Sequence, residues 1–156
     1  MAAADLKIST GARLLAAESY HVTLAFVGEV HERDAPIYRE IGANSSVPQC
    51  VIELNACEYW TSSQAVVLAA RENPRVLVPV TDRLRAAVVV HVPARSEERS
   101  WRAHATLARK VAQAPVLTGK SSIAWVSRSF ALMSSVTGGG HAVYTVVESW
   151  SLLDKA

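Results

Sequence analysis

The chain has 156 residues and a mass of 16.8 kDa, and half of its residues are apolar. A chain of this length and composition folds as one domain, or as one domain with two lobes, around a sizeable core. Its formal net charge of +2 at pH 7 permits a phosphate-bearing ligand, but the sequence has no polybasic tract for long duplex nucleic acid.

In the first half of the chain, three segments have the short apolar or alternating runs that are typical of β-strands: 20–27, 49–56 and 64–70. The first of them ends at Gly28, and the turn-like letters YWTSS separate the other two. Residues 32–46 carry apolar side chains at helical spacing and have Pro36 near their start, which predicts a surface helix.

In the second half, residues Val80 to Val90, preceded by Pro79, have the spacing of a helix. Four further segments have strand patterns: 101–108, 122–126, 129–134 and 142–150. The letters TGGG at 137–140 predict the hairpin turn before the last strand. Because strands outnumber helices and short turns join several of them, we expect an α+β fold with antiparallel sheets and helices on the outer faces.

The sequence also indicates where the protein resides. It contains no run of 18 apolar residues that could cross a membrane, and its start, MAAADLKIST, lacks the pattern of a secretory signal. The two cysteines, Cys50 and Cys57, are too few for a disulfide framework. Their odd spacing would place them on opposite faces of one strand, so we expect free thiols and a reducing, cytoplasmic environment.

One five-residue pattern, His-x-Thr-Leu-Ala, occurs twice, starting at His21 and at His104. Residues i and i+2 of a strand point to the same face, so each histidine would project together with its threonine, Thr23 or Thr106. The repeat, about half a chain apart, suggests two similar lobes. We expect the two motif strands to lie side by side, with both imidazoles pointing into one cleft.

Two converging imidazoles and two hydroxyls suit phosphodiester cleavage without a metal. One imidazole can remove a proton from the nucleophile while the other donates a proton to the leaving oxygen. The hydroxyls of Thr23 and Thr106 can donate hydrogen bonds to non-bridging phosphate oxygens. Arg109, just beyond the second motif, can add a positive charge where negative charge builds on phosphorus.

Two other uses of these histidines must be weighed. A single histidine on a strand is usually structural, but two copies of the pattern that share Leu and Ala are hard to explain by chance. A zinc site would want a third ligand and His-x-x-x-His or Cys spacing, and His31, His91 and His141 share no such pattern. We therefore predict that the protein has no metal site.

The two motifs in their context, YHVTLAFVGEV and WRAHATLAR, resemble the signatures of the 2H phosphoesterase superfamily. They look most like its bacterial and archaeal RNA 2′,3′-cyclic phosphodiesterases, also called 2′-5′ RNA ligases. The segment VIELNACEYWTSSQAVVLAA is similar to the family's strand–Tyr-Trp–strand region, and LMSSVTGGGHAVYTVVESWSL resembles its closing hairpin. The resemblance covers roughly Gly11 to Leu153.

The resemblance implies one bilobal domain over residues 1–156, with two antiparallel sheets around a central cleft and pseudo-twofold symmetry. It implies metal-independent and cofactor-independent hydrolysis of a terminal 2′,3′-cyclic phosphate to a 2′-phosphate, and it allows a weak reverse 2′-5′ RNA ligation. By analogy with the family, His104 is the general base for water and His21 is the general acid for O3′. Thr23, Thr106 and Arg109 match the phosphate-binding positions.

The sequence departs from the family before the first motif, where only 20 residues precede His21. From the resemblance, we expect the family's N-terminal strand to be missing from this stretch or replaced. We expect a monomer, although an exposed strand edge could recruit another chain. A milder departure is Ala103, which stands where a proline is common, with Ala105 where larger residues are frequent.

These features predict an enzyme that acts on RNA 3′ ends or small cyclic nucleotides. Phe26 and Trp101 are candidates for stacking a base, while the tryptophans in general are expected to be core residues. The alternative is a binding module that holds a nucleotide or an RNA end in the same cleft without turnover. Both histidines are present in this chain, which favours the enzyme, because binding alone would tolerate the loss of either.

Overall fold

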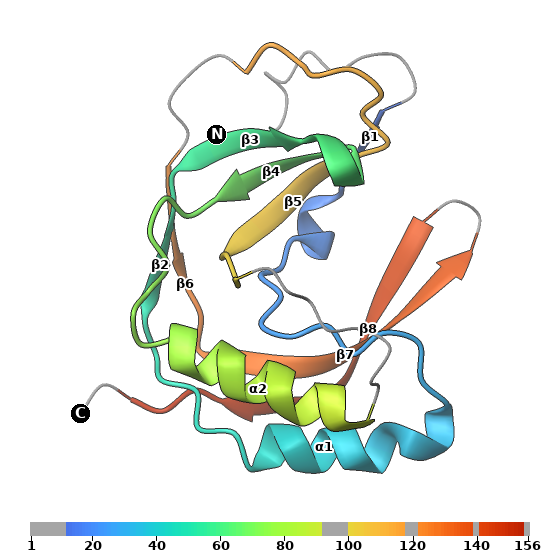
Figure 1. The fold of residues 1–156 in the computed structure, drawn as a ribbon, viewed down its shortest axis with the longest axis vertical. Coiled ribbons are helices and arrows are strands. Elements are labelled where there is room, and N and C mark those ends of the chain that lie inside the picture. The colour runs from blue at the N-terminus through green and yellow to red at the C-terminus, as the bar shows by residue number, and fades with distance from the viewer. Residues whose placement is uncertain (1–11, 92–99, 118–121, 139–140, 155–156) are drawn as a thin grey trace. The chain divides into compact units, whose positions relative to one another are not determined.

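The structure of the chain, a computed structural model, describes residues 12–91, 100–117, 122–138 and 141–154 (Figure 1). The chain divides into two compact units, each assembled from three separate segments. Unit 1 comprises Met1–Thr23, Ile52–Asn73 and Arg102–Trp125, and unit 2 comprises Leu24–Val51, Pro74–Trp101 and Val126–Ala156. Both histidine motifs contribute their histidine and threonine to unit 1, so the candidate site can be described within one unit.

Unit 1 is built on a four-stranded sheet with the strand order β1-β5-β4-β3 (Figure 1). Its strands are β1 (Arg13–Leu14), β3 (Ala56–Trp60), β4 (Ala65–Ala69) and β5 (His104–Arg109). All neighbouring strands in this sheet run antiparallel. β5, which begins at the second motif histidine, therefore has β1 along one edge and β4 along the other.

The centre of the sheet is β4, whose five residues, AVVLA, are all buried. Successive side chains of a strand point to opposite faces, so the sheet has a core cluster on each face. The first cluster comprises Ala65, Val67 and Ala69, and the second comprises Val66, Ala108 and Val111. We call the face of the first cluster the Val67 face, and Trp60 packs against that cluster.

A tight connection joins β3 to β4. It consists of one 3-10 turn, Thr61–Ser63, followed by Gln64 with a left-handed φ of 48°. This connection fixes the register of the hairpin, in which Trp60 is the cross-strand partner of Ala65.

Of the described residues, unit 2 contains two α-helices and a long two-stranded ribbon (Figure 1). These elements are α1 (Ala35–Ala43), α2 (Val78–His91), β7 (Ser129–Gly138) and β8 (His141–Ser151). On α2, Val80, Leu84 and Val88 recur every four residues and are buried, which is the pattern of a helix with one apolar face. At Gly42 of α1, the absence of a side chain leaves room for the Trp150 indole. The remaining strands, β2 (Val51–Leu54) and β6 (Ile123–Val126), form a separate two-stranded sheet.

The predicted fold class is confirmed, because the described residues combine helices with antiparallel sheets. The helices predicted at 32–46 and at Val80 to Val90 correspond to α1 and α2, and Pro36 lies in the first turn of α1. The strands predicted in the second half correspond to β5, β6, β7 and β8. The single bilobal domain over residues 1–156 stays a prediction, and part of the TGGG turn lies outside the described residues.

The strand predicted at 20–27 is wrong. After β1 the chain forms a 3-10 turn at Ala17–Ser19 and then runs through 20–27 without a strand ladder. β1 and β4 occupy both sides of β5, so residues 20–27 have no side of β5 with which to pair. The two motif segments are therefore not neighbouring strands, contrary to the prediction.

Two smaller predictions also need correction. Tyr59 and Trp60, read as part of a turn, belong to β3, so three strands rather than two separate the helices. Cys50 and Cys57 are free thiols as predicted, but Cys50 precedes β2 and Cys57 lies in β3, so they do not share a strand. In the part of the chain that the structure describes, no helix is long and apolar enough to cross a membrane.

Candidate active site

His104 opens β5 on the Val67 face of the sheet. Its cross-strand partner is Ala69, a member of the first core cluster, and cross-strand partners point to the same face. The imidazole is half-buried, and its Nδ1 lies 2.8 Å from the carbonyl oxygen of Arg102. A carbonyl can only accept, so Nδ1 carries the proton of this hydrogen bond. In the neutral ring, Nε2 is then the acceptor nitrogen.

His21 is held by the same kind of bond, although it does not lie in a strand. Its Nδ1 is 2.8 Å from the carbonyl oxygen of Ser19, again the residue two positions earlier. The imidazole is half-buried, and a positive charge on it lowers the pKa of His104. Thr23, two residues further along, is also half-buried and belongs to unit 1. His21 and His104 thus belong to one unit and are held by the same kind of hydrogen bond, and the convergence of their imidazoles in one cleft stays a prediction.

Thr106 and Arg109 share a face of the sheet because β5 contains a β-bulge. Thr106 is the partner of Val67, and Ala108 is the partner of Val66, so β5 advances two residues where β4 advances one. In a regular strand Arg109 would point away from Thr106, since their spacing is odd. The extra residue reverses that parity and turns Arg109 onto the Val67 face. The positive charge of Arg109 acts on His104 and lowers its pKa, in agreement with this placement.

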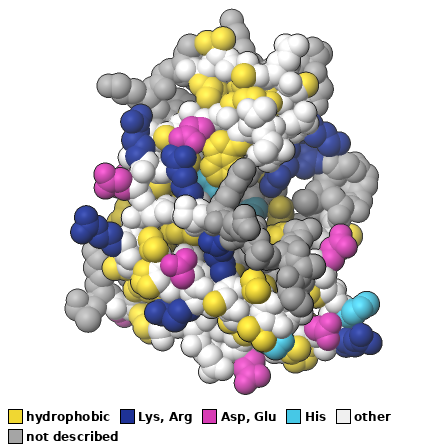
Figure 2. Space-filling model, viewed as in Figure 1, with side chains coloured by type: hydrophobic (Ala, Val, Ile, Leu, Met, Phe, Trp, Pro, Cys, Tyr) yellow, Lys and Arg dark blue, Asp and Glu magenta, His cyan; other side chains and the backbone are white. Residues whose placement is uncertain are grey.

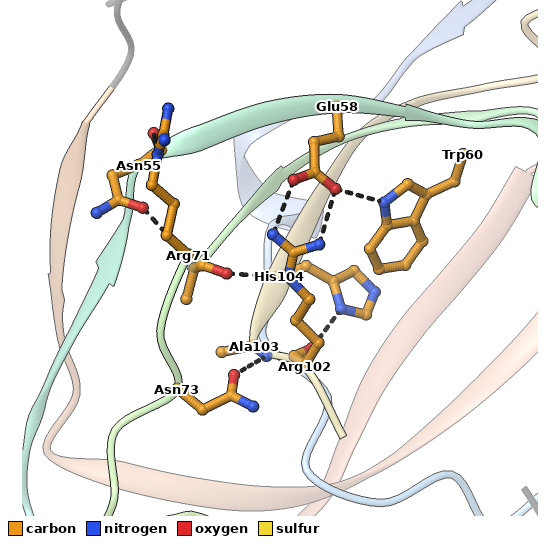
Figure 3. A network of polar contacts seen from close by, with 9 residues as sticks. Asn55, Glu58, Trp60, Arg71, Asn73, Arg102, Ala103 and His104 are labelled. Atoms are coloured by element: carbon orange, nitrogen blue, oxygen red, sulfur yellow. Dashed lines mark hydrogen bonds and ion pairs between the residues drawn. The ribbon is translucent and has the colours of Figure 1, made fainter. Parts of the chain in front are cut away.

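Three further residues, absent from the sequence prediction, surround His104 (Figure 3). The Trp60 indole lies against the imidazole with ring centroids 4.5 Å apart at an angle of 52°. The indole N–H donates to Glu58 Oε2 at 3.0 Å. Arg102 donates to both oxygens of the same carboxylate, from Nη1 at 2.9 Å and from Nη2 at 2.7 Å.

The electrostatics of the site favour a neutral His104. Burial is the largest cause that lowers its pKa, and the positive charges of His21, Arg109 and Arg102 lower it further, against the hydrogen bond to the Arg102 carbonyl. The hydrogen bonds from Arg102 and Trp60 hold the pKa of the Glu58 carboxyl below its ordinary value. His104 is thus biased towards the form that accepts a proton, and Glu58 towards the charged form.

The other sequence predictions fare differently. Phe26 and Trp101 both belong to unit 2, where Phe26 is half exposed, and their proposed base stacking stays a prediction. Among the described residues, no group of three or more His, Cys, Asp and Glu side chains could hold a metal ion. On the face that Figure 2 shows, Lys and Arg side chains are scattered among acidic and apolar ones.

One feature of the sequence could have predicted part of the cluster of Glu58, Trp60 and Arg102. In ACEYW, Glu58 and Trp60 are two residues apart and would share a face if the segment were a strand. The turn interpretation of YWTSS concealed that relation.

The comparisons with known proteins agree on the class. No protein-family model matches the chain as a whole or in part. The fold matches that of LigT-like 2H phosphoesterases, and similarity to these relatives supports a phosphoesterase. It is similar to the RNA 2′,3′-cyclic phosphodiesterase of Escherichia coli (strain K12), with 28% identity over 145 residues that cover 90% of this chain and 80% of that protein.

Solved structures show the same relationship. E. coli LigT complexed with NADP+ has a TM-score of 0.81 and 26% identity, covering 96% of this chain and 85% of LigT. LigT complexed with 3′-AMP has a TM-score of 0.77 and 28% identity, covering 90% and 80% of the two chains. A protein of Thermus thermophilus has a TM-score of 0.72 and 26% identity, covering 92% and 83%.

Proposed function

We propose that this phosphoesterase hydrolyses a 2′,3′-cyclic phosphate, at the end of an RNA or on a nucleotide, to a 2′-phosphate. The observation that carries the proposal is the pair of half-buried imidazoles in one unit, each with Nδ1 bonded to a backbone carbonyl. In both rings Nε2 is then the nitrogen that can exchange a proton with substrate. The name of the E. coli relative, RNA 2′,3′-cyclic phosphodiesterase, and the complex of LigT with 3′-AMP support this substrate class.

In the proposed reaction, water attacks phosphorus and the bond between phosphorus and O3′ breaks. His104 accepts a proton from the water, and His21 donates a proton to O3′, so the products are a 2′-phosphate and a free 3′-hydroxyl. Burial lowers the pKa of His104, which supports its assignment as the base, because a base must be neutral before it reacts. In a weak 2′-5′ ligation, the 5′-hydroxyl of a second RNA would replace water as the nucleophile. It would attack the cyclic phosphate, the bond between phosphorus and O3′ would break, and O3′ would take a proton, which leaves a 2′-5′ linkage and a free 3′-hydroxyl.

Three further residues would bind the phosphate. The hydroxyls of Thr23 and Thr106 would donate to non-bridging oxygens, and Arg109 would stabilise the charge that develops on them. Thr106 and Arg109 lie on the same face as His104, which supports the grouping. The acid, the base and the phosphate donors are all supplied by this chain, so the proposed steps use side chains only.

The test is to incubate the protein with an oligoribonucleotide that ends in a 2′,3′-cyclic phosphate and to identify the product ends. A 2′-phosphate is expected. Binding of the oligoribonucleotide without any product would support the alternative, a binding module, and a 3′-phosphate product would contradict the assignment of O3′ as the leaving oxygen.

A further inference from the structure

His104 belongs to a closed circle of contacts with Arg102, Glu58 and Trp60 (Figure 3). His104 Nδ1 bonds to the backbone carbonyl of Arg102, and the side chain of Arg102 bonds to Glu58. Glu58 accepts the N–H of Trp60, and the indole of Trp60 lies against the His104 ring. The chain of contacts thus returns to the residue from which it started.

These contacts restrain the His104 imidazole in two independent ways. The Arg102 carbonyl, 2.8 Å from Nδ1, fixes one edge of the imidazole, while the Trp60 indole covers one of its faces at a centroid distance of 4.5 Å. A bond at one edge still allows the imidazole to tilt about that bond. A packed aromatic face removes this freedom, so the direction of Nε2 is set by both contacts together.

The side chains that apply these restraints are themselves fixed. Besides its two bonds to Glu58, Arg102 donates from Nε to the Ala70 carbonyl at 2.9 Å, so its planar guanidinium is held along three directions. The next backbone N–H, of Ala103, donates to Asn73 Oδ1 at 2.9 Å. The carbonyl that receives His104 Nδ1 therefore lies in a backbone segment that is anchored at several points.

A contribution to stability alone does not explain this arrangement. The Glu58 and Arg102 side chains are 32% and 38% exposed, and ion pairs with that exposure contribute little to folding. Trp60 packs against the first core cluster, and a simple apolar contact there would not require its N–H to be bonded to the same carboxylate that holds Arg102.

We infer that Glu58, Trp60 and Arg102 form a clamp that positions His104 for proton transfer, with Glu58 linking the two contacts that orient the imidazole. This role deepens the proposed function and rests on it, since it assigns these three as positioning residues for a catalytic base. Glu58 also places a negative charge 2.7 Å from the Arg102 guanidinium, whose positive charge lowers the pKa of His104.

The clamp is tested by following the His104 imidazole by NMR as a function of pH, with His104→Gln used for assignment. In Trp60→Ala, water reaches the imidazole and the pKa of His104 should rise towards its ordinary value. Glu58→Gln removes a negative charge near His104 while the positive charges of Arg102, His21 and Arg109 remain, so the pKa of His104 should fall further. The two variants should thus shift the pKa of His104 in opposite directions.

Matched variants separate positioning from folding. Trp60→Phe keeps an aromatic ring on the imidazole but loses the N–H. The pKa of His104 in this variant should therefore lie between the values in the parent and in Trp60→Ala. Glu148→Gln removes a carboxylate that pairs with Arg39 at 3.5 Å in unit 2, and it should leave the His104 titration unchanged. In turnover of a 2′,3′-cyclic phosphate, Glu58→Gln and Trp60→Ala should lower kcat about 10- to 100-fold with KM little changed, as expected when a reacting group is misplaced.

The two proposals can fail separately. If folded Glu58→Gln, Trp60→Phe and Trp60→Ala all titrate at His104 as the parent does, the clamp is wrong, whatever the activity. If the variants shift the titration as described but the parent turns over no cyclic phosphate, the three residues control the His104 environment as inferred, and the proposed function, with the catalytic role that rests on it, is wrong.

Discussion

His21 and His104 are held by the same local contact: in each, Nδ1 lies 2.8 Å from the carbonyl oxygen of the residue two positions earlier. This contact does not depend on secondary structure, because His104 begins a strand whereas His21 lies in a segment without one. It fixes the same tautomer in both neutral rings and leaves Nε2 of each as the nitrogen for acid–base chemistry. The two histidines of the repeated motif therefore share one hydrogen bond to the backbone and one tautomer.

The pH dependence of turnover should be bell-shaped, with its acid limb below the ordinary imidazole value. His104 must be neutral to accept a proton, so activity rises as pH increases through its pKa. Burial lowers that pKa, which moves the acid limb below about 6.5. Activity should fall again at higher pH when the general acid loses its proton, and the two apparent values belong to the coupled pair. A profile of kcat/KM that is flat between about pH 5 and 9 would contradict the mechanism.

Arg109 should be needed for turnover because of where the bulge in β5 points it. Replacing Arg109 by Gln removes the charge that would stabilise the phosphate, and kcat/KM should fall by about 10²–10³-fold, as for other donors to a developing oxyanion. Lys110→Gln is the matched control, since it removes a neighbouring positive charge that we do not assign to the site. Equal losses in the two variants would indicate a general effect of charge rather than a directed contact.

Thr106 should matter less than the histidines. Thr106→Ala removes one hydrogen bond to phosphate that water can partly replace, so the loss in kcat/KM should be smaller than for His104→Ala. Thr106→Ser keeps the hydroxyl and should recover most of the activity. The kinetics of the three variants, with folding checked by circular dichroism, decide this ranking, and a Ser variant as slow as the Ala variant would refute the role of the hydroxyl.

The bonds between Glu58 and its two donors should stabilise the fold in a pH-dependent manner. The folded-state pKa of Glu58 is lowered, so its contribution is present above the unfolded value of about 4.5 and is lost as pH falls through the folded value. At pH 7, Glu58→Gln should reduce the free energy of unfolding by about 1 kcal/mol, because the pair is partly exposed. The free energies of unfolding of parent and variant, measured by urea titration, should converge in acid. A difference between them that grows as pH falls would contradict this prediction.

The sequence allowed the second half of the site to be predicted better than the first. His104 and Thr106 lie in a strand as expected, because β4 offers a buried apolar edge with which β5 can pair. The first motif has an equally apolar pattern, but β1 and β4 occupy both sides of β5, so the first motif does not pair with the second, and one sequence cannot reveal which segments take those places. The face of the sheet onto which Arg109 points depends on a β-bulge, and therefore on the register between β4 and β5. The contacts of Glu58 and Trp60 depend on a strand that was interpreted as a turn.

The most direct test of the two-histidine account is the hydrolysis of a 2′,3′-cyclic-phosphate oligoribonucleotide in EDTA by the parent, His21→Ala, His104→Ala and the double variant. We expect the parent to form a 2′-phosphate in the presence of the chelator. Each single variant, while folded and able to bind a 2′-phosphate, should be slower by about 10²–10⁴-fold. The double variant should be little slower than the slower single variant, because the two imidazoles act in one step. A folded single variant that turns over like the parent, or a parent activity that EDTA abolishes and zinc or manganese restores, would contradict the account.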